Sequence, residues 1–248
     1  MGTVVVTGSA TGIGRAIALR LGAEHAVVVN AKDSVGEGRE TADAIVASGG
    51  EAVFVQADVS TSRGAKEVIS RGREALGPVT LLVNNAGATR AAELGDWDES
   101  HWHDMLNTNL LSAALTTQAF VSQLGGAEGA VVNVASARGL PGRARIGVAA
   151  YAAAKAGVIS LTGALAQALA PQVSVNVVSP GFVNTRYFDR PDATDDDRAR
   201  IEAWRTAVPI QRFVEPGEIA DAVAFLLGNR GMTGANILAD GGWTLTRD

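Results

Sequence analysis

Short runs of β-branched residues alternate with longer stretches that have helical periodicity through most of the chain. The runs are continuously apolar, which is typical of strands buried on both faces of a sheet. The predicted strands are Thr3–Val6, Ala26–Asn30, Ala52–Gln56, Thr80–Asn84, Gly129–Ala135, Val173–Val178 and Ile237–Ala239. The predicted helices between them include Gly14–Leu21, Ser60–Leu76 and Glu99–Leu124.

This alternation predicts an α/β fold with a doubly wound parallel sheet of about seven strands and helices on both faces. No Pro-rich or Ser-rich linker and no repeat divides the chain, so residues 1–248 are predicted to form a single domain. Residues 184–209 depart from the alternation of strands and helices, because they contain no predicted strand. They carry three consecutive aspartates from Asp195 and a short helical pattern around Trp204. So long an excursion predicts a substrate-binding loop or lid within the domain.

Composition excludes several classes of function. The net charge is −5 and Lys and Arg do not cluster, so we expect no nucleic-acid partner. The chain has no cysteine, which excludes disulfides, thiolate catalysis and thiolate metal sites. No charged leader precedes the first strand, and no apolar stretch reaches the roughly 18 residues of a membrane span. We therefore expect a cytoplasmic protein with no membrane partner.

A glycine-rich turn, Thr7–Gly14, follows the first strand and opens the first helix. Glycines there permit a tight turn and let backbone N–H groups approach a pyrophosphate at the helix N-terminus. The spacing G-x-x-x-G-x-G differs from the ordinary dinucleotide fingerprint, and the turn lacks the Gly-Lys-Ser/Thr ending of a mononucleotide P-loop. A plain chain reversal is the alternative. The flanking strand and helix favour dinucleotide binding in a Rossmann-type sheet.

Other unusual residues stand at strand ends. Asp58, Asn84–Gly87, Ser136 and Pro180-Gly181 each follow a predicted strand. Ligands bind at the carboxyl ends of the strands in open α/β sheets, so position alone predicts that these segments meet at one crevice.

Tyr151 and Lys155 lie four residues apart near the start of a predicted helix, on one face of it. An ammonium beside a phenol favours the phenolate, so the pKa of the Tyr151 hydroxyl is expected to fall toward the working pH. Such a tyrosine can exchange a proton with a carbonyl or alcohol oxygen. Ser136 could hold that oxygen as charge develops, and it lacks the flanking glycines of a nucleophile elbow.

The histidines have no marked context. His101 and His103 lie two positions apart on a predicted helix and therefore point to different faces. We interpret them as solvated or capping residues, and no metal site is predicted.

In their order and spacing the motifs resemble the short-chain dehydrogenase/reductase family, nearly from end to end of the chain. The motifs are Thr7–Gly14, Asp58, Asn84–Gly87, Asn109, Ser136, Tyr151-x-x-x-Lys155, Pro180-Gly181 and Asp240-Gly241-Gly242. The resemblance implies an oxidoreductase that moves a hydride between a nicotinamide dinucleotide and a carbonyl or secondary alcohol. Tyr151 would be the general acid/base and Ser136 would polarise the carbonyl. Lys155 would tune Tyr151 and bind the nicotinamide ribose, and Asn109 would hold a water that links Lys155 to solvent.

The resemblance also implies the cofactor site. Asp58 would bind the adenine, Thr185 the nicotinamide amide, and Asn85 would line the site. Asn84 and Gly87 would mainly stabilise the sheet, although Gly87 also borders the cofactor. The full predicted set is Gly8, Ser9, Thr11, Gly12, Ile13, Gly14, Lys32, Asp58, Val59, Asn85, Ala86, Gly87, Tyr151, Lys155, Pro180, Gly181, Val183 and Thr185. The family further implies a homotetramer or homodimer built through the long helices.

The predicted cofactor is NADP(H) in preference to NAD(H). A carboxylate at the end of the second strand would bind the 2′-hydroxyl of NAD, but Ala31 stands there by the family's pattern. Lys32 follows, where a cation can pair with the 2′-phosphate of NADP. Two residues argue for NAD(H): Asp33 is adjacent to Lys32, and Thr11 stands where many NADP users carry Arg.

The sequence departs from the family's pattern in two places. The interval from Ser136 to Tyr151 is two residues longer than usual and contains Arg138, Arg143 and Arg145, and the segment before Asp240 is short. One of the three arginines is a candidate to bind an anionic group of the substrate, and solvated loop residues are the alternative.

Other functions remain open at this point. The chain could be a catalytically idle dinucleotide-binding subunit with a regulatory or scaffold role, although the complete set of Asn109, Ser136, Tyr151 and Lys155 disfavours that. A sugar-nucleotide epimerase or dehydratase would need a larger C-terminal part, and enoyl reductases place Tyr and Lys further apart.

Overall fold

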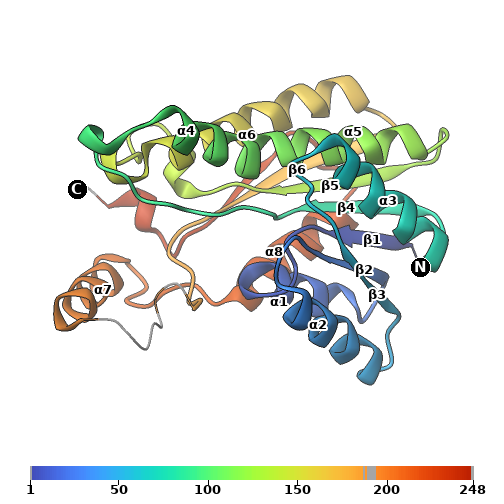
Figure 1. The fold of residues 1–248 in the computed structure, drawn as a ribbon, viewed down its shortest axis with the longest axis horizontal. Coiled ribbons are helices and arrows are strands. Elements are labelled where there is room, and N and C mark those ends of the chain that lie inside the picture. Colours follow the sequence, from blue (N-terminus) through green and yellow to red (C-terminus); the bar gives the residue numbers. More distant parts are fainter. Residues whose placement is uncertain (1, 187, 189–193, 247–248) are drawn as a thin grey trace.

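Seven parallel strands form one sheet in the order β3-β2-β1-β4-β5-β6-β7 (Figure 1). The structure, a computed structural model, describes residues 2–186, 188 and 194–246. The strands are β1 (Thr3–Val6), β2 (Ala26–Ala31), β3 (Ala52–Gln56), β4 (Val79–Asn84), β5 (Gly129–Val134), β6 (Val173–Pro180) and β7 (Asn236–Ala239). The chain runs outward from β1 to β3 and returns to place β4 beside β1, so the strand order reverses between β1 and β4.

Helices cover both faces of the sheet (Figure 1). One face carries α1 (Gly12–Leu21), α2 (Val35–Ala47) and α8 (Pro216–Gly228). The other face carries α3 (Ser62–Leu76), α4 (Glu99–Leu106), α5 (Ser112–Gln123) and α6 (Ala149–Leu169), while α7 (Asp195–Ala207) lies away from the sheet beyond the strand ends. Successive strand residues point to opposite faces, so Val4 and Val6 pack with one layer of helices and Val5 with the other. This two-sided burial explains the continuous apolar runs.

The predicted fold class is confirmed, and each predicted strand lies within two residues of an observed one. The predicted continuous helix Glu99–Leu124 is wrong in one respect. A π-helical turn, Asn107–Leu111, separates α4 from α5. Within it, the Asn109 side-chain amide donates to the carbonyl of Met105 at 3.0 Å, a local bond that competes with the regular helical ladder.

The apolar helix α6 packs against β6 and α4. The helical stretch Ile146–Leu169 is long and apolar enough to cross a membrane. Helices in the core of globular proteins also have such length and composition.

A buried polar chain ties the centre of the sheet to the helices on one face. Asn84 on β4 donates to the side-chain oxygen of Asn133 on β5 at 2.9 Å. Asn133 in turn donates to the hydroxyl of Thr162 on α6 at 2.9 Å. Asn133 and Thr162 are almost fully buried, so losing either bond would leave a polar group without water as a substitute.

We expect Asn133→Ala to destabilise the protein by about 2–4 kcal/mol, because it removes one buried hydrogen bond from each of its partners on β4 and α6 and leaves a space in the core. Urea unfolding followed by circular dichroism would measure this. Ser48→Ala, which removes an exposed hydroxyl bonded only within α2, is the control and should change stability by less than about 0.5 kcal/mol. Equal effects of the two substitutions would contradict the role given to Asn133.

Candidate active site

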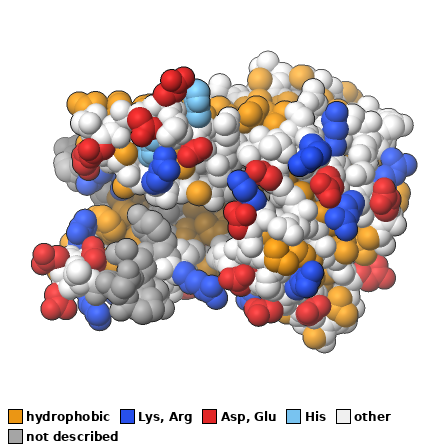
Figure 2. Space-filling model, viewed as in Figure 1, with side chains coloured by type: hydrophobic (Ala, Val, Ile, Leu, Met, Phe, Trp, Pro, Cys, Tyr) orange, Lys and Arg blue, Asp and Glu red, His pale blue; other side chains and the backbone are white. Residues whose placement is uncertain are grey.

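A cavity of about 790 Å³ lies at the carboxyl ends of the strands. Figure 2 shows the molecule hollowed between α7 and the layer that carries α4, with hydrophobic side chains inside the hollow. Most of the predicted site residues line it: Gly8, Thr11, Gly12, Ile13, Gly14, Asn85, Gly87, Asn109, Ser136, Tyr151, Lys155, Pro180, Gly181, Val183 and Thr185. Of the strand-end segments that were expected to meet at one crevice, all except Asp58 contribute to this lining.

Five predicted cofactor residues lie outside the cavity lining: Ser9, Lys32, Asp58, Val59 and Ala86. The Ser9 side chain is fully buried, where its hydroxyl donates to the carbonyl of Val6 and accepts from the backbone N–H of Asn30. Ala86 packs against the glycine turn, since a Cβ on Gly8 would lie 2.8 Å from the Cα of Ala86. Ser9 and Ala86 therefore support the glycine turn without lining the cavity. Contact of the five residues with a cofactor stays a prediction.

The N-terminus of α1 opens into the cavity and is suited to an anion. Thr11, its N-cap residue, makes no side-chain capping bond, and no acidic residue stands in the first turn. Gly8 and Gly12 have φ of 61° and 55°, which favours glycine. A Cβ on Gly14 would lie 2.2 Å from the carbonyl oxygen of Gly8, so only glycine allows this turn to fold against the helix. Backbone N–H groups and the helix dipole therefore fit a dinucleotide pyrophosphate here.

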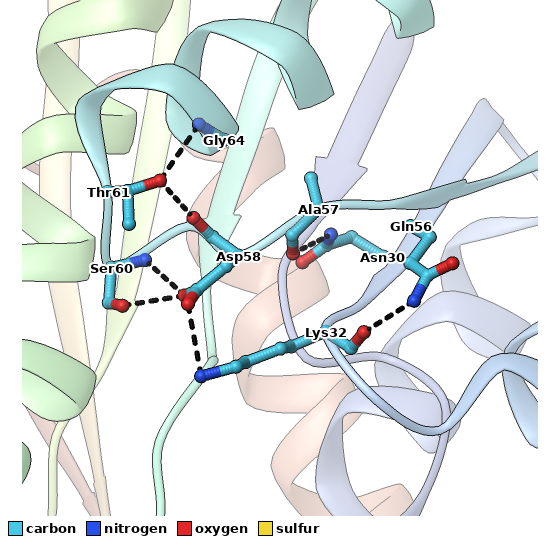
Figure 3. A network of polar contacts seen from close by, with 8 residues as sticks. All are labelled: Asn30, Lys32, Gln56, Ala57, Asp58, Ser60, Thr61 and Gly64. Carbon is cyan, nitrogen blue, oxygen red and sulfur yellow. Dashed lines mark hydrogen bonds and ion pairs between the residues drawn. The ribbon is translucent and has the colours of Figure 1, made fainter.

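The loops after β2 and β3 form the neighbouring end of the site (Figure 3). The Lys32 ammonium lies 3.0 Å from a carboxylate oxygen of Asp58, and the two side chains point toward each other from the two loops (Figure 3). The hydrogen bond that Lys32 donates to Asp58 raises the pKa of Lys32. Burial opposes ionisation of Asp58, but hydrogen bonds from Ser60 and Lys32 outweigh it and lower the pKa of that carboxyl.

Asn30 supports this end from beneath. Its side-chain amide donates to the carbonyls of Val55 and Ala57 at 3.1 Å each, which holds β3 against β2 at the point where Lys32 and Asp58 emerge. Its side-chain oxygen accepts from the backbone N–H of Gly8 at 3.3 Å. The glycine turn and the Lys32–Asp58 pair are thus connected through one buried side chain.

Lys155 lies at the other end of the cavity with 4% of its surface exposed. Its ammonium donates to the carbonyl of Val134 at 2.9 Å and lies 5.7 Å from the centre of the Tyr151 ring. Among the ion pairs of the described residues none includes Lys155. Burial without a counter-ion lowers the pKa of Lys155 to about 8.

Asn109 and Gly87 complete the surroundings of this lysine. The Asn109 amide donates to the carbonyl of Ala88 at 2.9 Å, and its oxygen accepts from the Ala88 N–H at 3.2 Å. A Cβ on Gly87 would lie 2.7 Å from the Asn109 oxygen and 3.2 Å from the Lys155 ammonium nitrogen. The π-helical turn therefore holds the loop after β4 against Lys155.

Ser136 ends the segment after β5 and is 7% exposed. Its hydroxyl oxygen accepts a hydrogen bond from the backbone N–H of Arg138 at 3.1 Å. That bond orients the hydroxyl and leaves its own proton to donate to an oxygen in the cavity. Close packing holds the segment, because a Cβ on Gly139 would lie 2.7 Å from the backbone of Lys155 on α6.

The far end of the cavity has an aromatic wall, which we define as Phe182, Phe188, Trp204 and Trp243. Phe182 stacks on Trp204 with ring centres 5.6 Å apart and meets Trp243 edge-on at 5.1 Å. Apart from the helical pattern around Trp204, no pattern in the sequence predicts this wall. Phe182 could have been found by its place after Gly181 at a strand end, whereas no local signal marks Trp243.

The position of His101 differs from the prediction that it is a solvated or capping residue. Its side chain is 5% exposed, and its Nδ1 accepts a hydrogen bond from the Arg90 side chain at 3.1 Å. The reason is that His101 lies with Met105 on the buried face of α4, which packs against α6. The cap of α4 is Asp98. The described residues contain no group of His, Asp and Glu able to hold a metal ion.

The chain matches the short chain dehydrogenase family over residues 2–196. It is 37% identical to a 3-oxoacyl-[acyl-carrier-protein] reductase, FabG, of Staphylococcus epidermidis, over 97% of this chain and 98% of that protein. It also resembles two solved structures. One, from Agrobacterium tumefaciens with bound NADP, is described as a 2-deoxy-d-gluconate 3-dehydrogenase (34% identity, TM-score 0.87, covering 99% and 97% of the two chains). The other, from Sinorhizobium meliloti, is described as a short-chain alcohol dehydrogenase (30% identity, TM-score 0.91, covering 99% and 97%).

The fold and the site thus define a dinucleotide-dependent oxidoreductase. The chain belongs to the short-chain dehydrogenase family, and it acts on a carbonyl or alcohol group. The predictions of family and reaction class are confirmed, and no finding favours the idle regulatory or scaffold subunit.

Burial of the Lys155 charge predicts an unusual pH dependence of stability. The pKa of Lys155 lies below its unfolded value, so the folded state binds fewer protons between about pH 8 and pH 10.5. Burying the ammonium lowers the free energy of unfolding by about 3 kcal/mol. This loss is fully present below pH 8 and disappears as the pH rises from about 8 to 10.5. We therefore expect the cofactor-free Lys155→Met variant to be at least as stable as the wild type at pH 7, and the wild type to gain on it above pH 8.

Urea unfolding between pH 7 and pH 10 would measure the difference. Lys66→Met, at an exposed position on α3, is the control and should show no such change with pH. A difference between wild type and Lys155→Met that does not change with pH would be inconsistent with a buried ammonium.

Proposed function

We propose that this protein reduces a carbonyl to a secondary alcohol, or runs the reverse reaction, with Tyr151 as the general acid/base. The observation that supports it is the meeting of Ser136, Tyr151 and Lys155 in one cavity, which also receives the uncapped N-terminus of α1. When bound, the nicotinamide cofactor supplies or accepts the hydride.

Each residue of the set has a distinct task. The Ser136 hydroxyl, oriented by the Arg138 N–H, donates to the substrate oxygen and holds the carbonyl. Tyr151 gives its hydroxyl proton to that oxygen in reduction and takes it back in oxidation. The nearby Lys155 ammonium stabilises the resulting phenolate and binds the ribose hydroxyls of the cofactor. Asn109 holds the loop beside Lys155 and connects it to solvent through water.

The cofactor is NADP(H). Lys32 pairs with the 2′-phosphate, and Ala31 presents no carboxylate that would repel it. The Agrobacterium structure described above contains NADP, which agrees with this choice. Asp58 binds the adenine, and Thr185 binds the nicotinamide amide.

The described part of residues 184–209 contributes to the substrate end of the cavity. Arg186, Arg200 and Trp204 line it from this segment, as a substrate-binding loop requires. Tyr187 and residues 189–193 of the predicted lid lie outside the described residues. The segment closes over the substrate and excludes water from the reacting centre.

The working protein is a homodimer or homotetramer in the cytoplasm, and its partner is a small carbonyl or alcohol compound. Support for assembly comes from α6, because only 33% of the most apolar stretch of Ile146–Leu169 is buried within one chain. A second copy would cover such a surface.

Tyr151→Phe removes one proton donor and little volume. We expect it to lower kcat by about 10²–10⁴-fold while cofactor affinity stays within about threefold of wild type. Steady-state assays on a ketone panel and a fluorescence titration with NADPH would measure the two quantities. Retention of more than a tenth of wild-type kcat would show that Tyr151 is not the acid.

Lys32→Ala tests the cofactor assignment. We expect it to raise KM for NADPH at least about tenfold and to change KM for NADH by less than about twofold, because only NADPH carries the phosphate. Lys66→Ala is the control for removal of an exposed lysine. A wild-type kcat/KM higher with NADH than with NADPH would contradict the preference itself.

A further inference from the structure

The ion pair between Lys32 and Asp58 lies where the loops after β2 and β3 meet (Figure 3). The Lys32 ammonium is 3.0 Å from Oδ2 of Asp58, and this carboxylate is its one ion-pair partner among the residues that the structure describes. Under the proposed function, Lys32 also binds the 2′-phosphate of NADP(H). The ammonium on which discrimination between the cofactors depends is therefore already paired with a carboxylate of the protein.

The Asp58 carboxylate is held in place by its own loop. Its Oδ1 accepts hydrogen bonds from the backbone N–H of Ser60 at 3.1 Å and from the Ser60 hydroxyl at 2.6 Å. The Asp58 carbonyl accepts from the Thr61 hydroxyl at 2.9 Å, and a Cβ on Gly64 would lie 2.1 Å from that carbonyl oxygen. The loop is thus packed against the first turn of α3, and the carboxylate has little freedom to withdraw from Lys32.

Lys32 is the movable member of the pair. Its backbone is held, because the Gln56 side-chain amide donates to the Lys32 carbonyl at 2.9 Å. Its side chain is 61% exposed, against 33% for that of Asp58. An exposed ion pair is a weak interaction, so the ammonium can leave Asp58 for a phosphate. Breaking the pair still lowers the affinity for that phosphate by up to about fivefold.

Sharing the ammonium between the two anions does not remove the conflict. Two oxygens that accept from one ammonium nitrogen at about 3 Å each lie no more than about 6 Å apart. That separation is shorter than the Debye length at physiological salt, about 8 Å, so the carboxylate and the phosphate repel each other. NADPH therefore meets a penalty at Asp58 whether Lys32 is shared or released. The uncharged 2′-hydroxyl of NADH does not carry the charge that creates this penalty.

We propose that Asp58 is a specificity-determining residue: its carboxylate competes with the 2′-phosphate for Lys32 and so limits the preference for NADP(H) over NAD(H). This inference rests on the proposed role of Lys32 in cofactor binding. Contact between Asp58 and the adenine, which the two cofactors have in common, would affect both alike and cancel from the ratio of their affinities. The charge of Asp58 thus has a consequence that an adenine contact does not have.

The substitution Asp58→Asn isolates that charge. The asparagine oxygen can keep the two bonds from Ser60 at the Oδ1 position, while the amide group that replaces Oδ2 offers Lys32 no charge. Calorimetric titration with adenosine 2′,5′-bisphosphate and with adenosine 5′-monophosphate measures the effect without catalysis. These two nucleotides differ only in the 2′-phosphate, so the ratio of their dissociation constants reports on that group.

We expect Asp58→Asn to raise the preference for the 2′-phosphate, the Kd of the monophosphate divided by that of the bisphosphate, by about threefold to tenfold. Titration with NADPH and NADH should show the same change. Asp33→Asn is the matched control, since it removes the same charge from an exposed residue next to Lys32 that forms no ion pair with Lys32 in the described structure. It should leave the preference within about twofold of wild type.

A preference that rises less than threefold in Asp58→Asn would overturn the inference, and so would a lower one, because Asp58 would then hold Lys32 in place for the phosphate. An equal rise in Asp33→Asn would also overturn it, because net charge and not the ion pair would be the cause. If Asp58→Asn binds neither nucleotide, Asp58→Ser replaces it in the same test, since a serine hydroxyl can make the same turn bond to the backbone.

Lys32→Ala separates this inference from the proposed function. A preference for the 2′-phosphate that Lys32→Ala does not lower would show that Lys32 does not bind the phosphate, and the cofactor assignment would fail together with the inference. A preference that is lowered by Lys32→Ala and unchanged by Asp58→Asn would reject the role of Asp58 alone.

Discussion

The buried ammonium of Lys155 is the constraint around which the site is arranged. A charge removed from water is destabilised unless polar groups replace its hydration, and here the Val134 carbonyl is the bonded replacement. The packing of α6 against β6 and the close approach of Gly139 and Gly87 leave only 4% of Lys155 exposed. The same packing holds Tyr151 one helical turn earlier, beside Lys155. The proton chemistry and the stability cost therefore have one origin.

Glycine at contact points lets the loops come close enough to share one cavity. Gly14, Gly87 and Gly139 each stand where a Cβ would collide with a neighbouring backbone or functional group. The reversal of strand order between β1 and β4 brings the first of these loops beside the second. The residues predicted for catalysis and cofactor binding meet there because the sheet topology directs the strand ends to the same edge.

The sequence predicted what is encoded locally or by position along strands. Continuous apolar runs predicted the seven strands, and most of the site residues predicted from the motifs line the cavity. The π-helical turn was missed because it depends on one side-chain bond from Asn109. The burial of His101 was missed because it depends on which face of α4 meets α6.

Features that are formed by segments distant in the sequence could not be predicted from local sequence patterns either. The aromatic wall joins Phe182, Trp204 and Trp243, which only the tertiary fold brings together. The same is true of Arg138, whose distinction from Arg143 rests on what each guanidinium touches.

Proton uptake on NADPH binding tests the central claim, that a buried Lys155 receives the cofactor. Calorimetric titration at pH 8 in buffers of different ionisation enthalpy measures it. Lys155 has a pKa of about 8 without cofactor, and ribose hydroxyls beside it favour the ammonium, so binding should take up about 0.5 proton per site. The Lys155→Met variant should take up none. Binding by the wild type without proton uptake, or with the same uptake as Lys155→Met, would contradict the account.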